Sequence, residues 1–537
     1  MTNSDLETIA GGLDAALAEL DRERIVERIW SKDHTVWNPD PAEISDRLGW
    51  LDLVAEPPRS ASEIRDLVVA VRDAGFRDAV LLGMGGSSLG AEALRASFGQ
   101  QPSGLRLHVL DSIHPAWVRR VRQAIDPATT LFLVASKSGT TAEVMAFFKY
   151  FWGETETAVG DVTTGQHFVA ITDPGTPLLT VAKDHGFRAV FTNPPDIGGR
   201  FSVLSRFGRV PAALAGLDPV RLLASGHAMG EKCRATRAAD NPGAWLGAVL
   251  GAAAHAGRDQ LTLLTSERIA SLGLWVEQLI AESTGKIGKG ILPVTGEPDA
   301  ATLDRHPRRL FVAVRYTPEP DADLEARLGR LKAAAQPVVE IDLADLYDLG
   351  GEFFRWQFAT AVAGHLIGVQ PFDQPDVESA KRETRHLLAA YEETGELPAV
   401  SAPADLAAVL DDGPDPSYVV FMAYADADPE LEQAVGELRH RLLAERGLTT
   451  TFGYGPRFLH STGQLHKGGP DGGLFVQLLA PGAADVRIPG EKYGLRLLLQ
   501  AQAAGDLAAL RHAGRRCVRI ELGDDPAAEI RRLHERV

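Results

Sequence analysis

The stretch DAVLLGMGGSSLGAEAL, residues 78–94, joins a short apolar run to a Gly/Ser turn and then to a helical pattern. A buried strand that leads through a tight turn into a helix is typical of a doubly wound α/β fold, in which helices cover both faces of a parallel sheet. Three similar apolar runs follow, each ending in a loop and another helical pattern: LRLHVLD (105–111), TTLFLVA (129–135) and HFVAIT (167–172). The sequence therefore predicts an α/β fold with a parallel sheet in this region.

Two further series of alternating patterns follow the first. The second contains QLTLLTS (260–266), the helical LGLWVEQLIAESTG (272–285), RRLFVAVRY (308–316) and QPVVEIDL (336–343). The third contains SYVVFMAYA (417–425), a helical pattern to about 446, LFVQLLA (474–480) and RRCVRIELG (515–523). Pro-rich and Asp-rich segments at 397–417 read as a linker. We expect four parts: a helical N-terminal segment (1–58), α/β domains at 59–235 and 236–396, and a C-terminal α/β lobe at 397–537.

Composition restricts the class of protein. The net charge of 55 − 72 = −17 argues against a general nucleic-acid or anionic-membrane surface, although a local pocket can still bind an anion. Two cysteines, at 233 and 517, argue against a disulfide framework or a cysteine-ligated zinc site and fit a reducing compartment. The N-terminus lacks the basic and apolar regions of a signal peptide, and the most apolar helical stretch is too short to span a bilayer. We expect a soluble cytoplasmic protein.

Two strand-to-helix turns are candidate phosphate sites, because backbone N–H groups at a helix N-terminus attract anions. The first turn holds Gly85, Gly86 and Ser87; as a dinucleotide fingerprint it fails, since Ser88 stands where the third glycine belongs, and a plain tight turn remains open. The second turn, SKSGTT, carries four hydroxyls and a lysine around Gly139: Ser136, Lys137, Ser138, Thr140 and Thr141. Helix capping needs only one of these hydroxyls, so the set favours a phosphate cradle.

Three other segments offer charged or polar groups for acid–base chemistry. In GGRFS, Gly199 allows close approach and Arg200 can face developing negative charge, or can be an ordinary loop ion-pair residue. Gln278 and Glu282 lie four apart on one face of a largely apolar helix, where a carboxylate becomes a stronger base; most helical glutamates are instead surface residues.

In PFDQPDVESAK the relevant side chains are Gln374 and, seven residues later and so two helical turns on, Lys381. Lys381 can reach a substrate oxygen, or it can be a solvated helix lysine.

As an ordered set these motifs resemble the glucose-6-phosphate isomerase family. GMGGSSLG is similar to its glycine-rich sugar-phosphate loop, SKSGTT to its phosphate loop, GGRFS to its arginine motif, QLIAESTGK to its catalytic glutamate motif and PFDQPDVESAK to its glutamine–lysine motif. The resemblance covers about residues 78–390. It departs from the family at Gly139, where an aromatic residue is often found.

The family's ring-opening histidine is the second departure. It belongs between the glutamate and lysine motifs, where this chain offers only His306, in a Pro/Arg-rich loop, and His365, in an apolar helical pattern. Residues 460–466, HSTGQLH, resemble the histidine motif shortened by one residue and moved behind Lys381. This order resembles the isomerase half of bifunctional transaldolase/phosphoglucose isomerase proteins. Because a transaldolase barrel takes about 250 residues, we expect isomerase activity only.

The resemblance implies two sugar-isomerase (SIS-type) domains and the interconversion of glucose 6-phosphate and fructose 6-phosphate. The SKSGTT hydroxyls, with Lys137 and Ser87, would hold phosphate, and His460 with Lys381 would open the ring. Glu282 would move the proton between C2 and C1 through a cis-enediol(ate) that Arg200 stabilises, while Gln374 orients the sugar. No metal or redox cofactor is implied. A homodimer is expected, because the histidine can come from the neighbouring subunit in this family.

Alternatives stay open at this point. One is an isomerase of a related phosphosugar, such as mannose phosphate, or of a sulfosugar. Another is a noncatalytic phosphosugar-sensing protein, against which the paired Glu282 and Lys381 motifs argue, since a sensor needs no proton shuttle. His466 and His306 also remain candidates for the ring-opening role.

Overall fold

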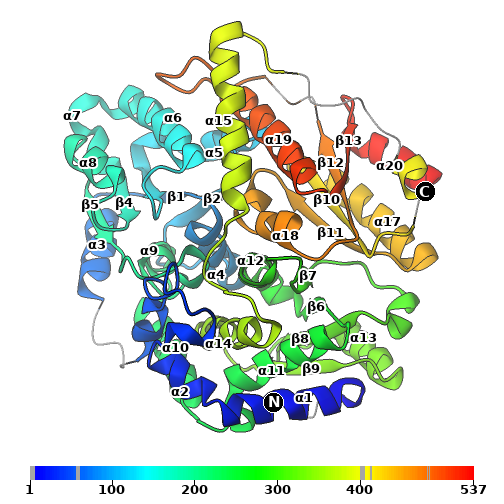
Figure 1. Cartoon of the computed structure of the whole chain (residues 1–537). Coiled ribbons are helices and arrows are strands. Elements are labelled where there is room, and N and C mark those ends of the chain that lie inside the picture. Colours follow the sequence, from blue (N-terminus) through cyan, green and yellow to red (C-terminus); the bar gives the residue numbers. More distant parts are fainter. Residues whose placement is uncertain (1–5, 56–60, 399–405, 412–413, 481, 483) are drawn as a thin grey trace.

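A computed structural model describes residues 6–55, 61–398, 406–411, 414–480, 482 and 484–537. The N-terminal segment consists of short helices, among them α1 (Ala10–Arg22), which packs beside α11 (Pro242–His255), and α2 (Ile25–Trp30), whose Trp30 contacts Phe354 and Phe358 (Figure 1). The remainder forms three parallel sheets with flanking helices, as the strand and helix patterns predicted. None of the described helices is long and apolar enough to cross a membrane.

The first sheet has the strand order β2-β1-β3-β4-β5. Its strands are β1 (Asp78–Gly83), β2 (Arg106–Leu110), β3 (Thr130–Ala135), β4 (Phe168–Thr172) and β5 (Ala189–Thr192). Its helices, which we group with it as the first unit (62–232), are α3 (Ser62–Asp73), α4 (Leu89–Phe98), α5 (Pro115–Ala124), α6 (Ala142–Val159), α7 (Asp161–Thr164), α8 (Pro177–Asp184), α9 (Arg206–Leu214) and α10 (Pro219–Lys232).

The second sheet has the order β7-β6-β8-β9 and belongs to the second unit (242–367). Its strands are β6 (Gln260–Thr265), β7 (Leu292–Val294), β8 (Arg309–Tyr316) and β9 (Val338–Leu343). Its helices are α11, α12 (Leu272–Thr284), α13 (Ala322–Ala333) and α14 (Leu349–Ile367). Helix α15 (Val377–Thr394) leaves this unit and packs along α19 (Leu495–His512) (Figure 1).

The third sheet has the order β11-β10-β12-β13 and belongs to the third unit (406–536). Its strands are β10 (Tyr418–Tyr424), β11 (Thr449–Tyr454), β12 (Gly473–Leu479) and β13 (Arg516–Glu521). Its helices are α16 (Leu406–Asp411), α17 (Pro429–Arg446), α18 (Gly463–Gly468), α19 and α20 (Pro526–Arg536). The expected boundary at 58/59 lies outside the described residues, as do residues 399–405 and 412–413 of the expected linker at 397–417, whereas residues 406–411 form α16.

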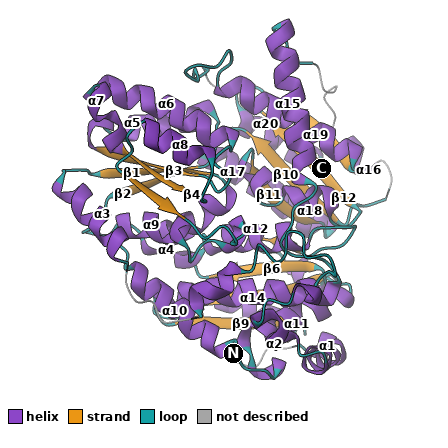
Figure 2. Ribbon diagram, turned by 60° about the vertical axis from the view of Figure 1, so that its left-hand side comes forward, coloured by secondary structure: helices purple, strands orange, loops and turns teal. Residues whose placement is uncertain are grey.

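The core explains how the three sheets are held together. Successive side chains of a strand point to opposite faces of its sheet. On β1, Ala79 and Leu81 join a cluster shared with the N-terminal segment and the second unit, whereas Val80 and Leu82 join a cluster shared with the third unit. The first sheet is therefore covered on both faces, and the three sheets lie around a common centre in Figure 2.

Candidate active site

Two glycine loops and the third unit meet beyond the end of β1. A Cβ atom on Gly86 would lie 2.1 Å from the carbonyl oxygen of Gly199, and one on Gly85 would lie 2.5 Å from that of His460. Gly85 also has a φ of +54°, which favours glycine. The glycines of GMGGSS are thus required for the close approach of two other segments. Ser87 lies in the same short 3₁₀ turn (Gly85–Ser87).

The SKSGTT turn connects β3 to α6 and is braced by its own hydroxyls. The Ser136 hydroxyl is buried, lies 2.9 Å from that of Thr141 and accepts the N–H of Gly139 at 3.1 Å. The hydroxyls of Ser138 and Thr140 are 3.0 Å apart. At the N-cap of α6, Thr141 makes no side-chain capping hydrogen bond with the described residues, so capping does not account for its hydroxyl.

Lys137 is directed away from this group of hydroxyls. Its ammonium group pairs with Asp173 and donates to the carbonyl oxygen of Pro195 at 2.9 Å. Its charge is therefore largely neutralised by Asp173 in this structure. A role in phosphate binding would require Lys137 to leave that partner.

A cavity of about 410 Å³ brings together residues of the first unit, of α15 and of the third unit. Its size suits a small ligand. Ser138, Thr140 and Thr141 line it from the first unit, Lys381 from α15 and His460 from the third unit. The ammonium group of Lys381 bonds to Glu378 at 2.7 Å, and the Lys381 side chain is 48% exposed, so it stands at the solvent side without contacting His460.

His460 is held by a carboxylate that lies 317 residues earlier in the chain. Its Nε2 lies 2.9 Å from Oε1 of Glu143 on α6, and Gln502 of α19 donates to the same oxygen at 2.6 Å. Burial alone would raise the pKa of Glu143, but His460 and Gln502 outweigh it and lower that pKa to about 2. Because an ionised carboxylate only accepts, Nε2 of His460 carries the hydrogen and Nδ1 is left as an acceptor in the neutral ring.

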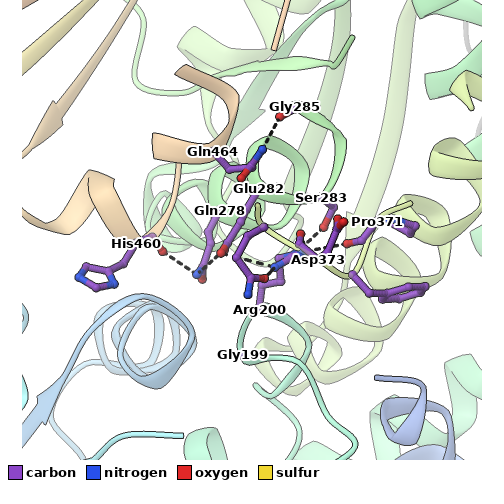
Figure 3. A network of polar contacts seen from close by, with 12 residues as sticks. Gly199, Arg200, Gln278, Glu282, Ser283, Gly285, Pro371, Asp373, His460 and Gln464 are labelled. Carbon is purple, nitrogen blue, oxygen red and sulfur yellow. Dashed lines mark hydrogen bonds and ion pairs between the residues drawn. The ribbon is translucent and has the colours of Figure 1, made fainter. Parts of the chain in front are cut away.

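Gln278 links His460 to Glu282. From one turn before Glu282 on α12, its side-chain amide donates to the backbone carbonyl oxygen of His460 at 2.7 Å and to Oε2 of Glu282 at 3.1 Å (Figure 3). The other carboxylate oxygen of Glu282 lies 3.4 Å from Nη1 of Arg200. The Glu282 side chain is 12% exposed, so the carboxylate is largely, but not wholly, shielded from solvent.

Arg200 is buried and surrounded by acceptors. Its Nε donates to the hydroxyl of Ser283 at 2.8 Å, and its Nη1 donates to Oε1 of Gln374 at 2.9 Å. Its Nη2 donates to the carbonyl oxygens of Pro371 and Asp373 at 2.7 and 2.8 Å. Burial lowers the pKa of this guanidinium, and Glu282 opposes that effect. The arrangement fixes one positive charge beside Glu282.

Gln464 ties the histidine segment to the glutamate motif. Its side-chain amide donates to the carbonyl oxygen of Gly285 at 3.0 Å and to Asp376 at 2.5 Å, and its carbonyl accepts the N–H of Asp376 at 2.9 Å. A Cβ atom on Gly285 would lie 2.4 Å from Cα of Leu465, so only glycine permits this contact. The third unit is thereby fixed against the end of α12.

The other candidate histidines lie outside the cavity. His466 is 2% exposed and packs between Phe458 and Phe475, with ring centroids 5.7 and 5.3 Å away. His306 is buried beside Thr449, and its Nε2 is 3.2 Å from the carbonyl oxygen of Gly447. His365 contacts the carbonyl oxygen of Val36. Of these four side chains, only that of His460 lines the cavity.

Sequence reasoning missed several residues that support the site. Glu143 lies only two residues after Thr141, in the first turn of α6, so its place next to the SKSGTT turn could have indicated a role in the site. Ser283 lies inside the glutamate motif, directly after Glu282, whereas Gln502 reaches the site through packing alone and no pattern in the sequence marks it. The role of Gln464 could be suspected only from its place inside the histidine motif.

Comparisons with known proteins show which family the chain is similar to. Residues 69–291 match the family model of phosphoglucose isomerase. Glucose-6-phosphate isomerase of Rubrobacter xylanophilus is 32% identical over 364 residues, which are 58% of this chain and 83% of that protein. An enzyme of the same name from Thermus thermophilus is 32% identical over 386 residues, 64% of this chain and 90% of that protein.

Solved structures show the same fold. A hypothetical protein of Thermus thermophilus superposes with a TM-score of 0.61 and 30% identity, covering 72% of this chain and all of that one. A glucose-6-phosphate isomerase of Chlamydia trachomatis superposes with a TM-score of 0.59 and 19% identity, covering 71% of this chain and 86% of that one. These similarities place the chain among parallel-sheet α/β folds. On sequence, the chain belongs to the glucose-6-phosphate isomerase family.

Proposed function

We propose that this protein is an aldose–ketose isomerase that interconverts glucose 6-phosphate and fructose 6-phosphate. The observation that carries the proposal is the link through Gln278, which bonds both to Glu282 and to the backbone of His460 beside the cavity of the SKSGTT loop. An anion site, a histidine and a carboxylate paired with an arginine are the groups that this reaction requires.

The phosphate group is proposed to bind at the N-terminus of α6, where Ser138, Thr140 and Thr141 line the cavity. Hydroxyls and free N–H groups there donate to an anion, and the helix dipole adds to the attraction. Further sugar-phosphate contacts are proposed for the residues around these groups: Gly85, Gly86, Ser87, Ser136, Lys137, Gly199, Gln278 and Gln374.

Ring opening is assigned to His460 with Lys381. The C1 hydroxyl loses a proton, the bond between C1 and the ring oxygen breaks, and the ring oxygen gains a proton. Nδ1 of His460 suits one of these transfers because Nε2 is committed to Glu143, and imidazole exchanges protons near neutral pH. The Glu143 carboxylate stabilises the imidazolium that forms when His460 accepts a proton.

Isomerisation is assigned to Glu282. Its carboxylate takes the C2 proton and returns it to C1, while a hydroxyl proton moves between the two oxygens. The cis-enediol(ate) intermediate carries negative charge, and Arg200 supplies a fixed positive charge 3.4 Å from Glu282. Because Arg200 is held by four hydrogen bonds, it needs little reorganisation as that charge develops.

The wider assignments rest on the resemblance and on composition. The position of the histidine motif behind Lys381 supports a relationship to the isomerase half of bifunctional transaldolase/phosphoglucose isomerase proteins. The division at residues 58, 235 and 396 is proposed as the domain organisation. The cytoplasm is the proposed compartment, since both cysteines are free thiols.

A homodimer is also proposed. The expected reason for it was that the neighbouring subunit supplies the histidine, and the contacts of His460 remove that reason. His460 contacts Glu143 and Gln278 of its own chain, so a partner subunit is not needed to bring it to this site. Co-expressing His460→Ala with Glu282→Gln tests this point. If each chain supplies its own histidine, mixed dimers stay inactive; recovered turnover would mean that His460 crosses between subunits.

The function is tested by a coupled assay for conversion of fructose 6-phosphate to glucose 6-phosphate by the purified full chain without added metal or redox cofactor. Mannose 6-phosphate serves as the competing substrate, because the epimers differ in one hydroxyl. Turnover that is abolished in Glu282→Gln supports the proposal. Binding of the sugar phosphates without turnover would indicate a sensor instead.

A further inference from the structure

The segment Gln370–Gln374, which connects α14 to α15, is held by buried cations from two sides. On one side Arg200 donates to the carbonyl oxygens of Pro371 and Asp373 and to the side chain of Gln374. The segment also braces itself, because Oε1 of Gln370 accepts the N–H of Asp373 at 2.9 Å. This segment therefore sets the position of the Arg200 guanidinium.

Lys286 holds the other side of the segment. It lies four residues after Glu282, just past the end of α12, and its side chain is 5% exposed. Its Nζ donates to the carbonyl oxygen of Gln370 at 2.5 Å and pairs with Oδ1 of Asp373 at 2.6 Å. Lys286 thus contacts both ends of the turn whose carbonyl oxygens accept hydrogen bonds from Arg200.

Keeping an ammonium group in this place is unfavourable by itself. Burial, together with the nearby charge of Arg200, lowers the pKa of Lys286 to about 7, although Asp373 and Glu282 oppose the shift. A buried cation is retained where its partners are well placed, and removing one partner leaves an uncompensated charge. Arg200, Lys286, Glu282 and Asp373 together form a cluster of two positive and two negative groups.

We propose that Lys286 is a positioning residue for the isomerase reaction: it fixes the Gln370–Gln374 segment so that Arg200 keeps its place beside Glu282. This inference rests on the proposed function. The Lys286 side chain is 5% exposed, and its ammonium group is taken up by the carbonyl oxygen of Gln370 and the carboxylate of Asp373, so it acts through Asp373 and Arg200 rather than by touching the sugar. The ESTGK motif then contains both the base, Glu282, and the residue that positions Arg200, Lys286.

A purely structural role predicts a different result from a positioning role. If Lys286 only stabilised the fold, its loss would lower the melting temperature and leave kcat of the folded enzyme unchanged. If it positions Arg200, kcat falls while KM changes little, since the phosphate loop is a separate part of the site. A displacement of about 1 Å in such a group can cost roughly 100-fold in rate.

The experiment compares Lys286→Met, Lys286→Arg, Asp373→Asn and the double variant Lys286→Met/Asp373→Asn with wild type. Lys289→Met is the matched control, because Lys289 lies three residues away and bonds instead to the carbonyl oxygen of Ile367. Each variant is measured for kcat and KM with fructose 6-phosphate, for binding of inorganic phosphate and for thermal unfolding.

We expect kcat of Lys286→Met to fall roughly 10- to 100-fold with KM within about threefold of wild type. Lys286→Arg should recover part of the loss, the double variant should lose no more than Lys286→Met alone, and Lys289→Met should match wild type. If Lys286→Met does not fold, Asp373→Asn carries the same test. Unchanged kcat in the folded variants would overturn the inference alone, whereas no turnover by wild type would overturn the proposed function and the inference with it.

Discussion

The second and third sheets have the same strand order, yet they contribute to the site in different ways. In the second unit Glu282 lies near the end of helix α12, which follows the first strand of its sheet, β6. In the third unit the corresponding helix is α17, and His460 comes instead from a short 3₁₀ turn (Arg457–His460) after the neighbouring strand β11. The same topology therefore places His460 on the cavity and Glu282 in the neighbouring Arg200 network, and Gln278 links the two.

This difference shows what each unit contributes. Glu282 is fixed by its own helix through Gln278 and by the neighbouring Arg200, so the second unit holds in place the carboxylate that we propose as the acid–base group. His460 has its ring held by Glu143 of the first unit and its backbone held by Gln278 of the second. The third unit thus brings a side chain whose orientation the other two units determine.

The largest effect is expected from removing the base of the second unit. Glu282→Gln keeps the shape and the bond from Gln278 but cannot take the C2 proton. We expect kcat to fall by roughly 10²–10⁴, with inorganic phosphate binding unchanged. Steady-state kinetics and phosphate titration measure both quantities. Near-normal turnover would remove Glu282 from the mechanism and would leave the second unit with a structural role only.

A smaller effect is expected from the phosphate loop of the first unit. Ser138→Ala/Thr141→Ala removes two hydroxyls that line the cavity, and we expect KM for the sugar phosphate to rise about tenfold because donors to the anion are lost. Ser136→Ala/Thr141→Ala serves as the comparison, since Ser136 is buried and braces the turn. An unchanged affinity of both double variants for substrate and phosphate would place the anion elsewhere.

The smallest effect on turnover is expected at Glu277, where the second unit faces the third. Glu277 lines a small cavity with Val420 and Phe421 of β10. Burial raises the pKa of its carboxyl group from 4.5 to about 7, despite the opposing hydrogen bond from Thr295. A raised pKa favours the folded state fully below about pH 4.5, and this contribution is lost as the pH rises through about 7.

Glu277→Gln stays neutral at every pH, so it should unfold like wild type at pH 4.5 and be more stable above pH 7, by roughly 1–3 kcal/mol. Denaturant unfolding at pH 4.5, 6 and 8 measures this difference, and kcat should be unchanged. A stability difference that is independent of pH would mean that the pKa of Glu277 is the same in the folded and the unfolded protein, so that burial does not raise it.

Much of the fold could be predicted because most strands are continuous apolar runs. The three strands that the patterns did not indicate are short, polar or partly exposed. They are β5, whose residues are mostly half-buried or exposed at a sheet edge, β7, which has three residues, and β11, which begins with three threonines. In these cases pairing with a neighbouring strand, rather than local hydrophobicity, decides the structure.

The site could be predicted where its residues lie in contiguous motifs. Glu282, Arg200 and the SKSGTT hydroxyls come from such motifs, and the structure brings them to one region. The bond between His460 and Glu143 joins residues 317 apart, and Gln502 lies on a helix of yet another segment. Such contacts depend on how the sheets pack. For the same reason the sequence could not reveal that Lys137 is paired with Asp173.

The most direct test of the account is a comparison of His460→Ala with His466→Ala. The two histidines lie in one motif, but only His460 reaches the cavity, whereas His466 is packed between aromatic rings. Turnover of the cyclic sugar phosphate and solvent-proton exchange on the open-chain form are measured for each folded variant. We predict that His460→Ala loses cyclic turnover but retains exchange, while His466→Ala is less stable and keeps both activities. Unchanged cyclic turnover in His460→Ala would contradict the claim that the third unit supplies the ring-opening group.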